Sequence, residues 1–280
     1  MITKLSILVP VFNELPTLEL VLTRITGLSL PIDHEVIVVD DGSTDGSEKV
    51  LCRWSESGRI RLHSHFTNQG KGCAIQSALC MAHGDVAVVQ DADLELDPGD
   101  LAGLLQPILR DEAKICFGSR FAFPSTPPLR FSLCYWANRI LNGLNNRMHG
   151  LRLTDFNTGY KMMTTELWRR LDLRERGFAI ECEITGKLAR MGCIIHERPV
   201  LYTPRRAREG KKIRAFDFLR YLAAIARYRF LRTPTTSAGA SSSVEASSHV
   251  ARSARHPLGI EVPRNETRHR TIPVVEPATV

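Results

Sequence analysis

The sequence predicts an α/β fold in which a mostly parallel sheet is covered by helices on both faces. Three observations carry this prediction. Short β-branched runs alternate with segments whose apolar residues recur at helical spacing, the runs are apolar at nearly every position, and polar loop-forming residues follow them. Strands buried on both faces have this composition, and parallel neighbours need a helical crossover between them. With 280 residues, of which 43% are hydrophobic, the chain can bury one substantial core.

The first half of the chain is expected to hold four strands and four helices in alternation. The strands are predicted at 5–9, 35–40, 59–65 and 85–91, and the helices at 17–27, 45–56, 71–83 and 98–109. In the less regular second half, helices are predicted at 131–149 and 178–191, and strands at 158–163 and 193–202. Ligands of parallel sheets bind beyond the carboxyl ends of the strands. Three of these strands are followed there by polar sequences: PVFNE, DDGSTDG and DADLELD.

Composition divides the chain into a folded domain at 1–214, a basic apolar helix at 215–232 and a disordered tail at 233–280. The tail is rich in Ser, Thr, Ala and Pro, and it cannot bury enough apolar surface to offset its ordering entropy. Arginines and aromatic residues in the helix suit the headgroup region of an anionic membrane. An ordinary domain-closing helix explains it equally well, because Arg229 falls on the face opposite Arg220 and Arg227.

The net charge of +7 is concentrated in one segment. Residues 198–232 contain eleven Lys or Arg and two acidic residues, a local balance of +9, so the rest of the chain is slightly acidic. Such a patch indicates an anionic partner at one place and argues against nucleic acid as a partner. The chain has seven cysteines but no C-x-x-C pair, which predicts that the protein resides in the reducing cytoplasm. The N-terminal apolar run is too short for a signal peptide, and no run reaches the ~20 apolar residues of a membrane-spanning helix. These observations predict a soluble or peripheral protein.

The clearest chemical signal is the acidic sequence DADLELD after the strand predicted at 85–91. Side chains alternate in an extended chain, so Asp91, Asp93 and Glu95 can point the same way beyond a buried strand. Clustered carboxylates suit a hard divalent cation, Mg²⁺ or Mn²⁺, that keeps open positions for a diphosphate. A solvated acidic loop is the alternative interpretation, because carboxylates are common after strands.

Two further segments fit a nucleotide site. Asp40 ends a predicted apolar strand, where its carboxylate can accept a hydrogen bond from a base, although a well-capped strand–turn–helix explains VVDDGSTDGS as well. In NQGKG, two glycines and Lys71 stand at a helix start, where backbone N–H groups can hold an anion and the lysine adds charge. A Gly-rich helix entry with an exposed lysine is the alternative there.

These segments, together with FGSR, DFNTGYK and GFAIECEI, occur in the order and approximate spacing of the family-two glycosyltransferases. Over residues 5–214 the chain resembles, more narrowly, the polyprenyl-phosphate (dolichol-phosphate-type) hexosyltransferases. The resemblance implies a GT-A (Rossmann-like) fold, a nucleoside-diphosphate sugar donor, a divalent metal and an inverting transfer. It also implies that the protein acts at the inner face of a membrane, where it binds an anionic surface or a membrane-anchoring partner.

The resemblance assigns roles to individual residues. Asp91 and Asp93 match the metal motif, and Glu95 stands where the family often has a glutamine near the metal. Asp93, Arg120 and Asp155 are the expected catalytic residues, Arg120 near the phosphates or donor sugar and Asp155 as a base or acceptor-site group. The positions expected to bind the donor are Pro10, Val11, Glu14, Asp40, Lys71, Gln90, Asp91 and Ala92. The positions expected to bind the phosphates and the acceptor are Arg120, Arg130, Arg205, Arg206 and Lys212, with the choice between Arg205 and Arg206 open.

In the implied reaction, metal and basic residues stabilise the leaving nucleoside diphosphate while a polyprenyl phosphate attacks from the opposite side. This acceptor is already anionic at neutral pH, whereas a sugar hydroxyl would need Asp155 or Glu183 as an obligate base. A same-fold transferase acting on a sugar hydroxyl is therefore one alternative, and a non-catalytic nucleotide-sugar or membrane-binding subunit is another. The residues do not distinguish UDP from GDP donors, or glucose from mannose and N-acetylhexosamines.

Overall fold

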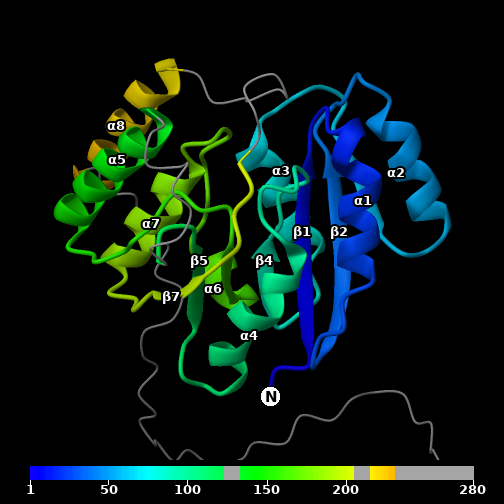
Figure 1. Ribbon diagram of the computed structural model, residues 1–280, viewed down its shortest axis with the longest axis horizontal. Coiled ribbons are helices and arrows are strands. Elements are labelled where there is room, and N and C mark those ends of the chain that lie inside the picture. The colour runs from blue at the N-terminus through cyan, green and yellow to red at the C-terminus, as the bar shows by residue number, and fades with distance from the viewer. Residues whose placement is uncertain (123–132, 205–214, 231–280) are drawn as a thin grey trace, which may run out of the picture. The chain divides into compact units, whose positions relative to one another are not determined.

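Within residues 1–122, 133–204 and 215–230, which the computed structural model describes, the chain forms a seven-stranded sheet flanked by helices (Figure 1). The strand order is β3 (Arg61–Ser64), β2 (Asp33–Asp40), β1 (Lys4–Val11), β4 (Val86–Val89), β6 (Lys161–Thr164), β5 (Ile115–Ser119) and β7 (His196–Pro199). Paired neighbours are parallel, except that β6 runs antiparallel to β4 and β5. The mostly parallel α/β fold predicted from the sequence is confirmed.

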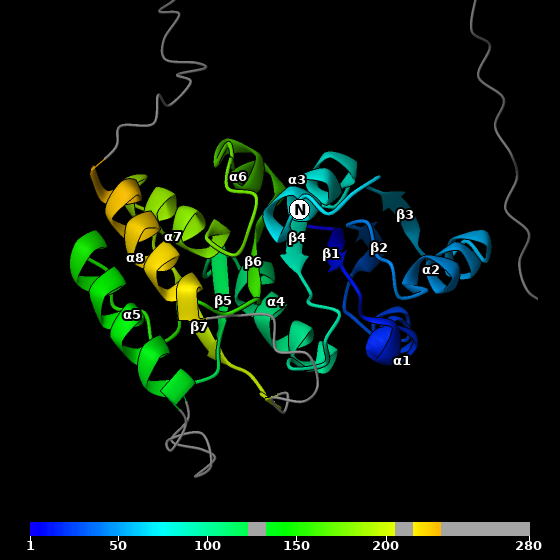
Figure 2. The ribbon, with the colours of Figure 1, turned by 90° about the horizontal axis from the view of Figure 1, so that it is seen from above.

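Helices cover both faces of this sheet (Figure 2). One face carries α1 (Leu15–Thr26), α2 (Ser47–Glu56) and α4 (Leu101–Leu109), and α4 is preceded by a 3₁₀ turn, η1 (Pro98–Asp100). The other carries α3 (Lys71–Met81), α5 (Leu133–His149), α6 (Thr165–Arg170), α7 (Ile180–Arg190) and α8 (Ala215–Phe230). Each face has its own core, with Leu18, Leu51 and Leu104 buried in the first and Trp168 and Leu188 in the second.

Two short elements were not predicted from the sequence. Strand β5 was missed although its apolar run KICFG is visible in the sequence and it is longer than β3 or β4, which were predicted. Helix α6 has six residues and is held by a local cap, in which the Thr164 side chain accepts a hydrogen bond from Leu167 N. Both lie beside the antiparallel strand β6, where the strand–helix alternation of the first half breaks down.

Helix α8 closes the domain along one of its faces. Tyr221, Ala224, Ile225 and Tyr228 are buried in the core that α8 shares with α5 and α7, while Leu219 faces outward. A domain-closing helix would pack in this way, and the bounds 215–232 and a membrane contact by the outer face stay predictions. The tail predicted at 233–280 lies outside the described residues. Among the residues that the structure describes, no helix is both long and apolar enough to cross a membrane.

The parallel strands bring distant parts of the chain to one edge of the sheet. Val11, at the end of β1, is level with Asp40 at the end of β2, and Leu8 is level with Val89 at the end of β4. The polar segments that follow β1, β2 and β4 therefore emerge next to one another. This edge is where the predicted ligand site should lie.

Candidate active site

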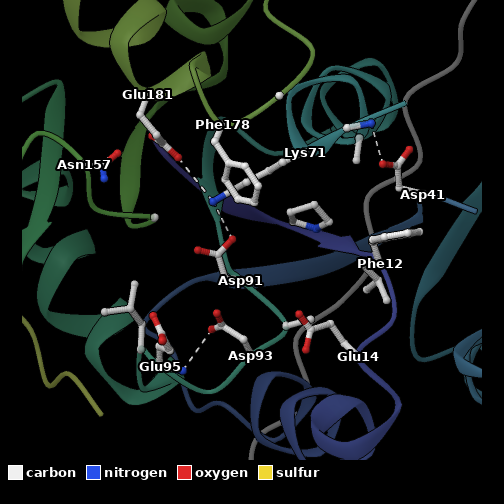
Figure 3. A pocket seen from close by; sticks show the side chains of 18 of the residues that line it. Phe12, Glu14, Asp41, Lys71, Asp91, Asp93, Glu95, Asn157, Phe178 and Glu181 are labelled. Carbon is white, nitrogen blue, oxygen red and sulfur yellow. Dashed lines mark hydrogen bonds and ion pairs between the residues drawn. The ribbon is translucent and has the colours of Figure 1, made fainter. Parts of the chain in front are cut away.

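A cavity of about 390 Å³ opens at the carboxyl ends of β1, β2 and β4 (Figure 3). Its size is typical of small-molecule sites. The residues of the predicted site that line it are Pro10, Val11, Glu14, Lys71, Asp91, Ala92, Asp93, Glu95 and Arg120. Asp40, Gln90 and Asp155 do not line it. Arg130, Arg205, Arg206 and Lys212 lie outside the described residues.

The acidic loop after β4 has a fixed conformation. Leu94 adopts a left-handed backbone conformation, with φ of 57°, which is uncommon for a residue with a branched side chain. This turn lets the backbone N of Glu95 donate to Asp93 Oδ1 at 3.1 Å. On the other side, the Thr17 hydroxyl of α1 donates to the carbonyl of Ala92 at 2.7 Å. Asp91 and Asp93 are therefore presented to the cavity from a backbone that is anchored at both ends.

The three carboxylates of this loop do not form a metal site by themselves. Nowhere in residues 1–122, 133–204 and 215–230 do three or more Asp, Glu, His or Cys side chains gather as a group that could hold a metal ion. The prediction that Asp91, Asp93 and Glu95 converge as a ligand set is thus not met. Two carboxylates beside an open cavity still fit Mg²⁺ or Mn²⁺, because Mg²⁺ commonly binds one or two carboxylates and takes its other ligands from substrate phosphates and water.

Lys71 enters the cavity and forms ion pairs with two carboxylates (Figure 3). Its Nζ lies 2.7 Å from Asp91 Oδ1 and 3.4 Å from Glu181 Oε1. Burial alone would lower the pKa of Lys71, but the charges of Asp91 and Glu181 outweigh it and raise that pKa above its usual range. Lys71 is therefore a permanent ammonium within the cavity, and the interpretation of an exposed lysine is wrong.

The start of α3 does not offer its backbone to an anion. The N–H groups of Gly72 and Cys73 donate to the carbonyl of Arg176, at 2.6 and 3.2 Å. A Cβ on Gly72 would lie 2.0 Å from the carbonyl oxygen of Glu175, so glycine is needed for this close approach. The prediction that these N–H groups hold an anion is corrected: the segment before α7 caps them, and Lys71 contributes through its side chain.

Glu181, on the first turn of α7, joins Lys71 to a second buried lysine. Lys161, at the start of β6, donates both to Glu181 Oε2 and to the carbonyl of Thr158. Burial lowers the pKa of Lys161, and the Glu181 carboxylate opposes that shift. Asp91, Lys71, Glu181 and Lys161 thus form a chain of alternating charges that runs from the cavity wall into the protein interior, where Lys161 is buried.

Gly159 supports Asp91 from the side opposite Lys71. A Cβ at this position would lie 2.2 Å from Asp91 Oδ2 and 3.2 Å from its Cγ. We therefore expect Gly159→Ala to displace the Asp91 carboxylate and to lower turnover by roughly tenfold or more, because misplacing an aligned group by about 1 Å can cost about a hundredfold. Turnover and melting temperature should be compared with those of Gly103→Ala, where a Cβ meets nothing within 4 Å. Equal activity of the two variants would contradict the prediction.

Arg120, just after β5, is clamped by Asp155. Its Nε lies 2.7 Å from Asp155 Oδ2 and its Nη2 2.8 Å from Oδ1, a bidentate pair. Burial alone would lower the pKa of Arg120, but Asp155 more than compensates and raises it. Asp155 is 1% exposed and both of its oxygens bond Arg120. The expectation of Asp155 as a base is corrected: it orients Arg120, and Arg120 faces the cavity.

Glu183 is likewise unsuited to act as a base. It is fully buried, accepts hydrogen bonds from the backbone N–H groups of Arg174 and Glu175, and pairs with Lys187 at 2.7 Å. These contacts fix the segment before α7 and point away from the cavity, which Glu183 does not line.

At the end of β2, where a nucleotide contact was predicted for Asp40, it is Asp41 that lines the cavity. Asp40 is buried and its Oδ1 accepts from Ser43 N at 3.1 Å, whereas Asp41 lines the cavity. Asp41 Oδ2 accepts from Gly70 N, and Oδ1 accepts from Gln69 N and pairs with His65 Nδ1 at 2.7 Å. Adjacent aspartates point in different directions, and the sequence does not say which one continues the cavity wall.

Gln90 supports the site from behind. It is fully buried, and its Oε1 accepts a hydrogen bond from the Tyr160 hydroxyl at 2.6 Å. Its assignment to donor binding is therefore corrected to a structural contact between β4 and the segment before β6.

Several residues of the wall were missed in the sequence. Glu181 and Phe178 stand in the GFAIECEI segment, which was recognised as a motif without roles for these two. Six further missed residues have amide or aromatic side chains that no spacing rule singles out. They are Phe12, Asn68, Asn138, Asn157, Tyr202 and Tyr221.

Comparison with known proteins places this site in a family. The family model described as "Glycosyl transferase family 2" matches residues 6–171. The undecaprenyl-phosphate mannosyltransferase of Micrococcus luteus is 29% identical over 215 residues, which cover 73% of this chain and 85% of that protein. The dodecaprenyl-phosphate galacturonate synthase of Rhizobium johnstonii is 27% identical over 61% of this chain and 50% of its own length. A Pyrococcus furiosus dolichol-phosphate mannosyltransferase is 30% identical over 42% of this chain and 33% of its own length.

Solved structures agree on the fold. Glucosyl-3-phosphoglycerate synthase from Mycobacterium tuberculosis, in complex with UDP, superposes with a TM-score of 0.62 at 22% identity, covering 83% of this chain and 82% of that one. The same enzyme with Mn²⁺, UDP and glucosyl-3-phosphoglycerate gives a TM-score of 0.59 at 21% identity. At this level of identity the likeness shows a shared GT-A fold.

Proposed function

The chain belongs to glycosyl transferase family 2, and we propose that it moves a hexose from a nucleoside-diphosphate sugar, of the GDP-mannose or UDP-glucose type, to a polyprenyl phosphate. The transfer is inverting and uses Mg²⁺ or Mn²⁺. It takes place at the cytoplasmic face of a membrane, where the protein is bound peripherally. The similarity to transferases named for undecaprenyl, dodecaprenyl and dolichol phosphates supports this acceptor class.

The observation that carries the proposal is the charge arrangement of the cavity. Asp91 and Asp93 lie on one side of it, and the ammonium of Lys71 and the guanidinium of Arg120 face the same space. A nucleoside diphosphate can bind to the carboxylates through a shared metal ion and to the two cations through direct ion pairs.

Each group then has a defined task. Asp91 and Asp93 would hold the divalent ion, which supplies Lewis-acid stabilisation of the leaving diphosphate when bound. Arg120 is held rigidly by Asp155, so its guanidinium is preorganised towards the phosphates or the donor sugar. Asp41 lies on the side of the cavity formed by β1 and β2, where the nucleoside is expected.

The positions of Asp155 and Glu183 favour a phosphate acceptor over a sugar hydroxyl. A hydroxyl acceptor was expected to use one of these two as its base, and both are buried in other contacts. A lipid monophosphate is already anionic near neutral pH and has no proton to lose on attack. It needs cations near the acceptor, a role that stays predicted for Arg130, Arg205, Arg206 and Lys212.

The proposal is tested by assaying the purified full chain against UDP and GDP sugars, with Mg²⁺ or Mn²⁺, for release of nucleoside diphosphate. Each donor is offered with a short polyprenyl phosphate and, as a matched control, with the polyprenol of equal length. We expect transfer to the phosphate and only slow donor hydrolysis with the polyprenol. Equal rates with polyprenyl phosphate and polyprenol, for every donor, would contradict the acceptor assignment.

A further inference from the structure

Within this chain of charges, the ammonium of Lys71 is paired with Asp91, an expected metal ligand. From this geometry we infer that Lys71 is an internal counter-ion that competes with the divalent metal for Asp91, so that metal binds well only together with a diphosphate. Glu181 is the positioning residue that retains Lys71 in the cavity once Asp91 binds the metal. The inference rests on the proposed function for its metal and its diphosphate, and it adds an order to their binding.

The contact distances define the competition. Lys71 Nζ lies 2.7 Å from Asp91 Oδ1, so this oxygen is already paired with a full positive charge when no ligand is bound. Asp91 Oδ2 is confined by Gly159, whose Cα hydrogens occupy the space that a Cβ would need. The carboxylate can turn little without losing one of these two contacts. A divalent ion that binds Asp91 must therefore displace the ammonium or accept a second cation a few ångströms away.

A diphosphate removes this conflict. Two cations close together repel each other strongly in a partly buried site, because the effective dielectric constant is well below that of water. The oxygens of a nucleoside diphosphate can lie between them, with some bonded to the metal and others to the ammonium. Metal and diphosphate then bind with positive coupling, and by linkage each raises the affinity of the other by the same factor.

Glu181 offers Lys71 a second carboxylate with which to form an ion pair. Its Oε1 lies 3.4 Å from Lys71 Nζ, a longer contact than the one to Asp91, while its Oε2 is held by Lys161. Lys161 is anchored in turn by the carbonyl of Thr158, so the Glu181 carboxylate stays in position whichever acid Lys71 prefers. Without Glu181, Lys71 would keep only Asp91, and the metal would face a stronger competitor.

The test measures Mn²⁺ binding to the full chain by electron paramagnetic resonance of the free ion, first without nucleotide and then with UDP or GDP. Lys71→Met should bind Mn²⁺ alone about tenfold more tightly than the wild type, and the gain from adding nucleoside diphosphate should shrink by a similar factor, within the usual range of such couplings. Glu181→Gln combined with Lys161→Met removes one charge of each sign from this chain of charges. This variant should bind Mn²⁺ alone more weakly than the wild type.

Lys4→Met is the matched control, because Lys4 also pairs with a carboxylate, Glu35 at 3.3 Å, but stands outside the cavity. It should leave Mn²⁺ binding unchanged. Equal Mn²⁺ affinity for Lys71→Met and the wild type would overturn the inference while leaving the proposed transfer intact. Absence of Mn²⁺ binding in every variant, even with nucleotide, would also overturn it. Sugar transfer that persists in chelator would then show that the metal assignment failed and the transferase did not.

Discussion

Asp93→Asn is expected to lower glycosyl transfer by about a hundredfold or more while leaving the fold intact. The substitution keeps the shape of the side chain and the oxygen that accepts from Glu95 N, but it removes one of the three negative charges that face the cavity from the acidic loop. Loss of a single preorganised electrostatic stabiliser typically costs about 10²–10³ in turnover. The measurement is kcat for transfer, together with the melting temperature, at saturating metal and donor.

Asp97→Asn is the matched control for this experiment. Asp97 lies on the same loop and its side chain accepts from Gly99 N, a contact that an amide oxygen can replace, but it does not line the cavity. Chelation of divalent metal should reduce wild-type transfer as severely as Asp93→Asn does, and added Mn²⁺ should restore it. Full wild-type activity in the chelator would show that Asp93 acts without a metal.

The sequence predicted the fold and part of the cavity wall because both depend on local patterns. Apolar strands that alternate with helices determine a parallel sheet, and the carboxyl ends of β1, β2 and β4 meet at one edge. Residues that directly follow a strand, such as Asp91 and Asp93, are thereby placed without knowledge of their neighbours. Helix α6 escaped this reasoning because six residues are too few to show a helical period. Strand β5 was missed because it lies in the second half, where the strand–helix alternation breaks down.

The pairing of charges was not predictable in the same way. Lys71, Asp91 and Glu181 stand on three different elements, and their contacts depend on the position of α7 over the sheet. The capping of α3 by the carbonyl of Arg176 likewise joins segments far apart in the chain. Sequence spacing relates only residues that are close along the chain. It therefore predicted an anion at N–H groups that already donate to the carbonyl of Arg176.

The second large effect concerns Arg120 and its clamp. We expect Arg120→Ala to reduce transfer by about a hundredfold or more, as for other lost electrostatic groups. Arg120→Lys should be nearly as damaging, because an ammonium cannot make the two parallel bonds to Asp155 and would not point the same way. Arg61→Lys is the matched control, since Arg61 also pairs with a carboxylate, Glu35 at 3.2 Å, and does not line the cavity.

Asp155→Asn separates orientation from base catalysis. If Asp155 acts only through Arg120, the single change should lower transfer by about tenfold or more, and combining it with Arg120→Ala should cost little beyond Arg120→Ala alone. Residues that act through one contact are non-additive in this way, whereas independent functions multiply. The four proteins of this double-mutant cycle are compared by kcat/KM for the donor, with melting temperatures to confirm folding. A double variant whose loss equals the product of the two single losses would mean that Asp155 has a task of its own, and the positioning assignment would have to be given up.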